Sequence, residues 1–138
     1  MIGIVVSEFN KIITEKLLEG AKKVLEENKY NYEVYFVSGS FEIPIMIKLL
    51  SKKKTFVGFI AIGCIIKGET EHYKYIAKAV SYGIMKLSLE LGIPITFSIL
   101  IVDNLEQALN RAGGKFGNKG EASAKALIKI LKNLWNFL

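Results

Sequence analysis

Cysteine and histidine are nearly absent from this sequence, which has one residue of each, Cys64 and His72. A single cysteine excludes an intrachain disulfide and a thiolate-rich metal site. One histidine in addition does not supply the ligands of a structural zinc ion, so we expect no metal site.

The sequence also lacks long apolar runs and a recognisable leader. No stretch reaches the roughly 20 apolar residues that cross a membrane, and the opening residues have neither the basic region nor the cleavage site of a signal peptide. We therefore expect no membrane partner and a cytoplasmic location. Yet 51% of the residues are apolar, which is rich for a monomer and favours burial of the surplus in a subunit interface.

Acidic residues are outnumbered, and the net charge of +6 raises the question of nucleic-acid binding. The basic residues are scattered along predicted helices, and only Lys52, Lys53 and Lys54 form a run. The sequence has no nucleic-acid-binding motif and no platform of interleaved aromatic and basic residues. We therefore expect no nucleic-acid partner.

Apolar runs alternate with segments of helical periodicity along the whole chain. The runs at residues 1–6, 32–37, 56–62 and 95–102 are typical of strands buried on both faces. Helical spacing follows each of them. The pattern predicts an α/β fold, a single domain over residues 1–138 with a four-stranded parallel sheet covered on both faces by helices.

The stretch at residues 63–73 connects the third predicted strand to a long predicted helix. Gly63 and Gly68 allow close approach of the backbone, and Thr70 is placed to cap the helix. A helix N-terminus presents unpaired N–H groups and a positive dipole end, which favour a bound anion. His72 lies in the first turn, where an imidazole can act as a general acid or base. A solvated or structurally bonded histidine is the alternative.

Polar loops follow all four predicted strands, at residues 7–10, 38–42, 63–72 and 102–104. In an open parallel sheet, ligands bind beyond the carboxyl ends of the strands. We therefore expect these loops to converge at one edge, where Glu42 can accept hydrogen bonds from the hydroxyl groups of a ligand. Alternatively, Glu42 is a solvated carboxylate in the first turn of a helix.

Four more side chains have both a functional and a plain structural explanation. Phe9 and Phe97 can stack on a planar ligand, or they can simply contribute to packing. Arg111 is the single arginine of the chain, and its planar guanidinium can hold a phosphate through two hydrogen bonds; a solvated helix residue is the alternative. Cys64 is predicted to be a small buried apolar residue, since no base is evident near it.

The glycine-rich stretch at residues 112–120 is predicted to be a loop, in which Lys119 can bind a phosphate. It is not a nucleotide P-loop, because Asn118 and Gly120 stand where that motif requires glycine and a hydroxyl residue, and because it follows a helix. A mobile surface loop is the alternative. The last helix should then reach the chain end with an apolar face formed by Leu127, Ile130, Leu131 and Leu134.

Five blocks are spaced along the chain in a fixed order. They are residues 7–10 (SEFN), 39–44 (GSFEIP), 63–73 (GCIIKGETEHY), 106–108 (EQA), and 111–113 with 117–120 (RAG and GNKG). In this order they resemble the lumazine synthase family of riboflavin biosynthesis. The resemblance covers nearly the whole chain and implies a flavodoxin-like three-layer αβα sandwich.

The resemblance also implies a reaction. Members of this family condense 5-amino-6-(D-ribitylamino)uracil with 3,4-dihydroxy-2-butanone 4-phosphate, without a metal or an organic cofactor. The products are 6,7-dimethyl-8-ribityllumazine, phosphate and water. Carried over by motif, His72 moves protons, and the remaining residues bind the two substrates. The residues from the same subunit are Phe9, Ser40, Phe41, Glu42, Cys64, Ile65, Ile66, Glu69 and Thr70, and those from the adjacent subunit are Phe97, Arg111 and Lys119.

The family implies a homopentamer with sites between adjacent subunits, and association with riboflavin synthase as a further partner. Its members often carry a segment ahead of the first strand that reaches a neighbour. This sequence shows essentially none, which leaves assembly of pentamers into an icosahedral shell open. We still expect a pentamer, because the site needs residues of two subunits. Ser38 and Lys67 also depart from the proline and arginine that are common at these positions. A non-catalytic flavin- or lumazine-binding protein, or a structural shell protein, of the same fold is the alternative.

Overall fold

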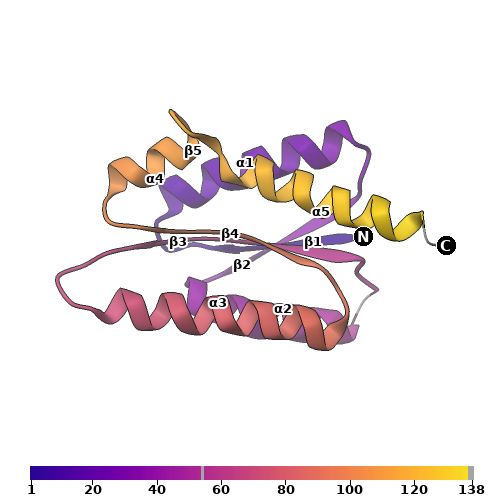
Figure 1. The fold of residues 1–138 in the computed structure, drawn as a ribbon, viewed down its shortest axis with the longest axis horizontal. Helices are drawn as coiled ribbons and strands as arrows, with labels where there is room; N and C mark the ends of the chain where they lie inside the picture. The colour runs from indigo at the N-terminus through magenta and orange to yellow at the C-terminus, as the bar shows by residue number, and fades with distance from the viewer. Residues whose placement is uncertain (54, 137–138) are drawn as a thin grey trace.

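The computed structural model describes residues 1–53 and 55–136 and shows a sheet between two layers of helices (Figure 1). Four parallel strands form the sheet in the order β2-β1-β3-β4. The predicted four-stranded parallel sheet is therefore confirmed. The strands are β1 (Ile2–Ser7), β2 (Tyr32–Val37), β3 (Gly58–Ile66) and β4 (Ile95–Val102).

The helices divide between the two faces of this sheet. Figure 1 shows α1, α4 and α5 on one face and α2 and α3 on the other. A short 3-10 helix, η1 (Ser40–Glu42), leads into α2. The bounds are α1 (Lys11–Glu27), α2 (Ile43–Lys53), α3 (His72–Leu91), α4 (Leu105–Arg111) and α5 (Lys119–Trp135). The second helix was predicted to run to the lysine run and the last helix to the chain end. Lys54 and residues 137–138, where these helices were predicted to end, lie outside the described residues.

Two apolar clusters form the core, one on each face of the sheet. Successive side chains of a strand point to opposite faces, so Ile4 and Ile60 pack under α1 and α5 while Val5 and Phe59 pack under α2 and α3. All of β1 is buried because it lies between two strands and two helical layers. This explains why the strands read as continuous apolar runs rather than as alternating ones. Within the described part of the chain, no helix is long and apolar enough to cross a bilayer.

Two predictions of local secondary structure were wrong. Residues 63–66 were predicted as part of a turn, but they continue β3, because their backbone pairs with β4 from Gly63↔Ile99 to Ile66↔Val102. The predicted loop at residues 112–120 contains a small antiparallel hairpin of β5 (Ala112–Gly114) and β6 (Gly117–Asn118). Gly113 and Gly117 adopt positive φ values of 109° and 81°, which allow this tight turn.

The apolar face of α5 differs from the predicted one. Leu127 is fully buried, and Leu131 packs against the same cluster. Ile130 and Leu134 are 44% and 54% exposed, respectively. The stripe that meets the sheet and α1 passes instead through Ala124, Leu127 and Ile128, so Ile130 and Leu134 are turned away from it.

Candidate active site

The ends of β1, β2 and β3 open into one cavity of about 370 Å³. It lies beyond the carboxyl ends of the strands, where the topology predicts a ligand site. The four loops lie at one edge as predicted, but the fourth, at residues 102–104, does not line this cavity. That loop follows the edge strand β4, and the Lys67 N–H donates to the Val102 carbonyl oxygen at 2.9 Å beside the third loop. The cavity is lined by Phe9, Gly39, Ser40, Phe41, Glu42, Cys64, Ile65, Ile66, Gly68, Thr70, His72, Tyr73 and Ile76.

The short helix η1 brings Ser40 against the middle of the sheet. Ser40 is only 7% exposed, and an added Cβ at Gly63 would lie 2.4 Å from its Oγ. Packing within the chain therefore requires the Ser40 side chain to lie close to the Gly63 backbone, and the sequence predicted a close approach at this glycine. Phe41 and Glu42 follow on the exposed side of η1 and line the cavity mouth.

The turn after β1 holds the Phe9 ring at the cavity. Asn10 has a left-handed backbone with φ 60°, and its Nδ2 donates to the Cys64 carbonyl oxygen at 2.8 Å. The Ser7 Oγ accepts from the Phe9 N–H at 3.2 Å. The sequence interpretation gave Asn10 no role. The available signal was that asparagine tolerates the left-handed conformation better than most residues.

The start of α3 forms the other wall of the cavity. The helix begins at His72 with Glu71 in the capping position, so the prediction that Thr70 is the N-cap was wrong by one residue. Thr70 instead uses its Oγ1 to accept from the His72 N–H at 3.2 Å, a local turn that threonine often makes. Gly68 lines the cavity, and a Cβ there would meet no atom within 4 Å. The backbone at Gly68 therefore borders open space in which a ligand can lie.

Charge at this helix start is partly paired. Glu71 and Lys74 form an ion pair at 2.6 Å on the exposed surface. The hydrogen bond with Lys74 lowers the pKa of the Glu71 carboxyl, and the same bond raises the pKa of the Lys74 ammonium. His72 is exposed and lines the cavity, so its imidazole can contact a bound ligand. Glu69 is also exposed but does not line the cavity.

Cys64 is buried in β3 with 1% exposure. Burial raises the pKa of its thiol to about 11, so the thiol stays protonated near neutral pH and is a poor nucleophile. This agrees with the prediction of a small buried apolar residue. In the described residues, no group of three or more potential metal-ligating side chains gathers.

The three residues that the resemblance assigns to an adjacent subunit lie away from this cavity. Phe97 lines a separate cavity of about 400 Å³ with residues of α3 and β4. Arg111 ends α4, where its Nη1 donates to the Gln107 carbonyl oxygen at 3.0 Å and its guanidinium carbon lies 5.1 Å from the centre of the Phe116 ring. Lys119 is the exposed first residue of α5. One chain therefore does not bring these residues together with His72.

Comparison with known proteins agrees with this architecture. Residues 1–134 match the family model described as 6,7-dimethyl-8-ribityllumazine synthase. The chain belongs to this family. It is similar to the 6,7-dimethyl-8-ribityllumazine synthase of Limosilactobacillus reuteri, with 47% identity over 131 residues that cover 94% of this chain and 86% of the relative. It is also similar to the enzyme of the same name from Pediococcus pentosaceus, with 41% identity over 133 residues that cover 94% and 85% of the two chains.

The match confirms the resemblance that the five sequence blocks indicated, and it assigns the chain to a family of riboflavin biosynthesis enzymes. The three-layer α/β architecture is consistent with this lumazine synthase family.

Proposed function

We propose that this protein forms 6,7-dimethyl-8-ribityllumazine, phosphate and water from 5-amino-6-(D-ribitylamino)uracil and 3,4-dihydroxy-2-butanone 4-phosphate, the penultimate step of riboflavin synthesis. The observation that best supports this is one cavity lined by an aromatic ring, a carboxylate and an imidazole, contributed by Phe9, Glu42 and His72. A flat heterocycle, a polyol chain and a proton-transfer step require these three kinds of group.

The pyrimidine binds between the Phe9 turn and the end of β3. The Phe9 ring is 69% exposed, so it presents an aromatic face on which a planar ring can stack. Cys64, Ile65 and Ile66 line the pocket for the heterocycle along β3. At the mouth, Ser40, Phe41 and Glu42 hold the same substrate and its ribityl chain, with Glu42 accepting hydrogen bonds from hydroxyl groups.

The phosphate of the second substrate binds at the start of α3, near Glu69 and Thr70. Unpaired N–H groups and the positive end of the helix dipole favour an anion there. The phosphate is both a handle that orients the butanone and the leaving group, so a preformed anion site stabilises the charge that is released. Arg111 of the adjacent subunit adds a planar cation, and Lys119 adds a second positive charge.

The chemistry requires positioning and proton transfer rather than a nucleophile from the protein. The amine of the pyrimidine substrate attacks the ketone directly, which agrees with the protonated state of the buried Cys64 thiol. Imine formation, phosphate loss and ring closure each move protons, and His72 serves these steps as a general acid and base. No metal or organic cofactor is required by this scheme.

The proposal includes a homopentamer in which Phe97, Arg111 and Lys119 complete the cavity of a neighbour. Their separation from the cavity within one chain supports this arrangement. Exposed apolar residues on α3, such as Tyr82, Met85 and Leu89, supply contact area. We also propose a cytoplasmic location and association with riboflavin synthase. Sedimentation of the purified protein, alone and with riboflavin synthase, tests the assembly and this association.

The direct test is incubation of the purified protein with both substrates. We expect lumazine absorbance to increase in step with released phosphate. Tight binding of lumazine or flavin without any product would instead identify a non-catalytic binding protein. A protein that neither turns over nor binds these compounds would fit a structural role.

Shared sites can be tested by mixing two inactive subunits. Glu42→Ala damages the cavity, and Arg111→Ala damages the contribution to the neighbour. In randomly mixed rings of equal amounts, about a quarter of the sites combine an intact cavity with an intact neighbour. Co-expressed variants should therefore regain activity that neither has alone, and no recovery would contradict sites between subunits.

A further inference from the structure

We propose that Asn118 is a positioning residue for the site of the adjacent subunit. It acts through Arg111 and Lys119, which it holds in place by clamping their hairpin to α1. This inference rests on the proposed function, in which those two cations reach a neighbouring cavity. The sequence interpretation used Asn118 to exclude a P-loop and as part of a family block, and gave its side chain no role.

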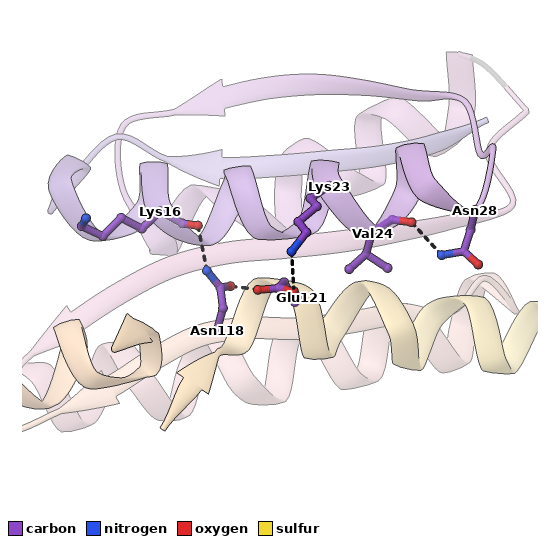
Figure 2. A network of polar contacts seen from close by, with 6 residues as sticks. All are labelled: Lys16, Lys23, Val24, Asn28, Asn118 and Glu121. Atoms are coloured by element: carbon purple, nitrogen blue, oxygen red, sulfur yellow. Dashed lines mark hydrogen bonds and ion pairs between the residues drawn. The ribbon is translucent and has the colours of Figure 1, made fainter. Parts of the chain in front are cut away.

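The Asn118 carboxamide uses both of its ends to join two helices (Figure 2). Its Nδ2 donates to the Lys16 carbonyl oxygen in α1 at 3.0 Å. Its Oδ1 accepts from the Glu121 N–H in the first turn of α5 at 3.1 Å. The same side chain therefore caps α5 and ties its start to α1.

Glycine on both helices makes room for this clamp. A Cβ at Gly20 in α1 would lie 2.4 Å from the Asn118 Oδ1. A Cβ at Gly120 in α5 would lie 1.9 Å from the Leu17 carbonyl oxygen. Since these separations are far below van der Waals contact, the helices could not approach so closely with any larger residue.

An ion pair beside the clamp contributes much less. Lys23 of α1 and Glu121 of α5 lie 3.8 Å apart, with side chains that are 62% and 32% exposed (Figure 2). Exposed pairs at this separation stabilise a protein by only about 0–1 kcal/mol. The carboxamide is therefore the specific link between the two helices at this point.

The clamp influences the positions of Arg111 and Lys119 because Asn118 belongs to the hairpin that connects these two residues. In the hairpin register Asn118 pairs with Ala112, the residue after Arg111, and Asn118 directly precedes Lys119. The hairpin has strands of only three and two residues, and a two-stranded hairpin this short is marginal in water on its own. Its position, and that of the cation at each end, therefore depends on an anchor to the body of the domain.

Contacts within the hairpin orient Arg111 but do not attach it to α1. The guanidinium packs over the Phe116 ring and bonds to Gln107 in its own helix. The Phe116 N–H donates to the Asn110 carbonyl oxygen at 2.8 Å. These partners all lie in α4 or in the hairpin, so they do not fix the hairpin to α1. That attachment comes from the buried Ala112 side chain, which packs in the same cluster as α1 residues, and from the polar Asn118 clamp at the Lys119 end.

The decisive variant is Asn118→Ser, which keeps an oxygen for the α5 cap but is too short to donate to Lys16. Gly20→Ala perturbs the clamp from the opposite helix, because its Cβ displaces the carboxamide while the hairpin sequence stays native. Asn28→Ala is the matched control. Its Nδ2 donates to the Val24 carbonyl oxygen at 2.8 Å, the same kind of bond at the far end of α1 (Figure 2).

We expect Asn118→Ser and Gly20→Ala each to raise KM for the butanone phosphate about tenfold, since small displacements of a binding group have large effects. KM for the pyrimidine should change less than about twofold, because its proposed contacts are made by residues of the other subunit and not by the hairpin. Asn28→Ala should lower the melting temperature and leave both KM values unchanged.

Two outcomes separate the inference from the proposed function. A wild-type protein that forms no product overturns the function itself. An active wild type with unchanged KM for the butanone phosphate in both clamp variants overturns the positioning role alone. Equal increases in both KM values would likewise show a general structural effect and contradict the inference. If Asn118→Ser does not fold, Gly20→Ala supplies the same readout.

Discussion

Gly63→Ala should destabilise the protein by about 1–3 kcal/mol, the usual cost of inserting a methyl group into a packed site. The new Cβ would lie 2.4 Å from the Ser40 Oγ and 3.4 Å from two carbons of Ile99. An ordinary carbon–oxygen contact is roughly 1 Å longer than the first of these distances. Because Gly63 lies inside β3 and Ser40 is buried in η1, either the hydroxyl rotates or η1 moves away from the sheet.

A double-mutant cycle tests whether this overlap is the cause. Ser40→Ala removes the clashing oxygen, so the double variant should be more stable than additivity predicts by about 1 kcal/mol or more. Gly68→Ala is the control for stability, since a Cβ there meets no atom within 4 Å. A double variant no more stable than the sum of the single changes would refute the steric explanation.

The assay is urea unfolding at one fixed protein concentration, because assembly makes apparent stability concentration-dependent. Kinetics provide a second readout. If η1 moves, Phe41 and Glu42 move with Ser40, and KM for the pyrimidine substrate should rise. If only the Ser40 hydroxyl rotates, stability should fall while this KM changes little.

Four further predictions concern Arg111, Cys64 and Gly120. Arg111→Ala should raise KM for the butanone phosphate and lower turnover more severely than His72→Ala, which should slow proton transfer only in part; steady-state kinetics in which Arg111→Ala is silent would remove Arg111 from the site. Burial raises the pKa of Cys64 from 9.0 to about 11, so its alkylation near neutral pH should be about a hundredfold slower than that of a free thiol. The folded state also disfavours the thiolate, so Cys64 should make the free energy of unfolding fall as the pH rises from 9.0 to about 11, and Cys64→Ala should make the fall measured in a pH series of urea titrations smaller. Gly120→Ala should destabilise by about 3 kcal/mol or more, because its Cβ would lie 1.9 Å from a carbonyl oxygen of α1; a measured cost below about 1 kcal/mol would contradict this contact.

Errors in the sequence interpretation came from contacts between segments distant along the chain and from elements too short to show a periodic pattern. Gly63 was a reasonable signal for a turn, yet pairing with β4 extends β3 through Ile66. The short hairpin was predicted as a loop because β5 and β6 have too few residues to form a periodic pattern. Asn10 has no local signature for its bond to Cys64, which lies 54 residues away.

The order of strands and helices, the parallel sheet and the family were all determined by the sequence itself. Continuous apolar runs and helical periodicity are local properties, and the five spaced blocks depend only on residue identity and order. Tertiary structure decided which polar loops share a cavity, and it placed His72 in that cavity while leaving Arg111 and Lys119 outside it. It also gave Asn118 two partners on different helices. These relations depend on distances between segments remote in the chain, which composition and spacing do not encode.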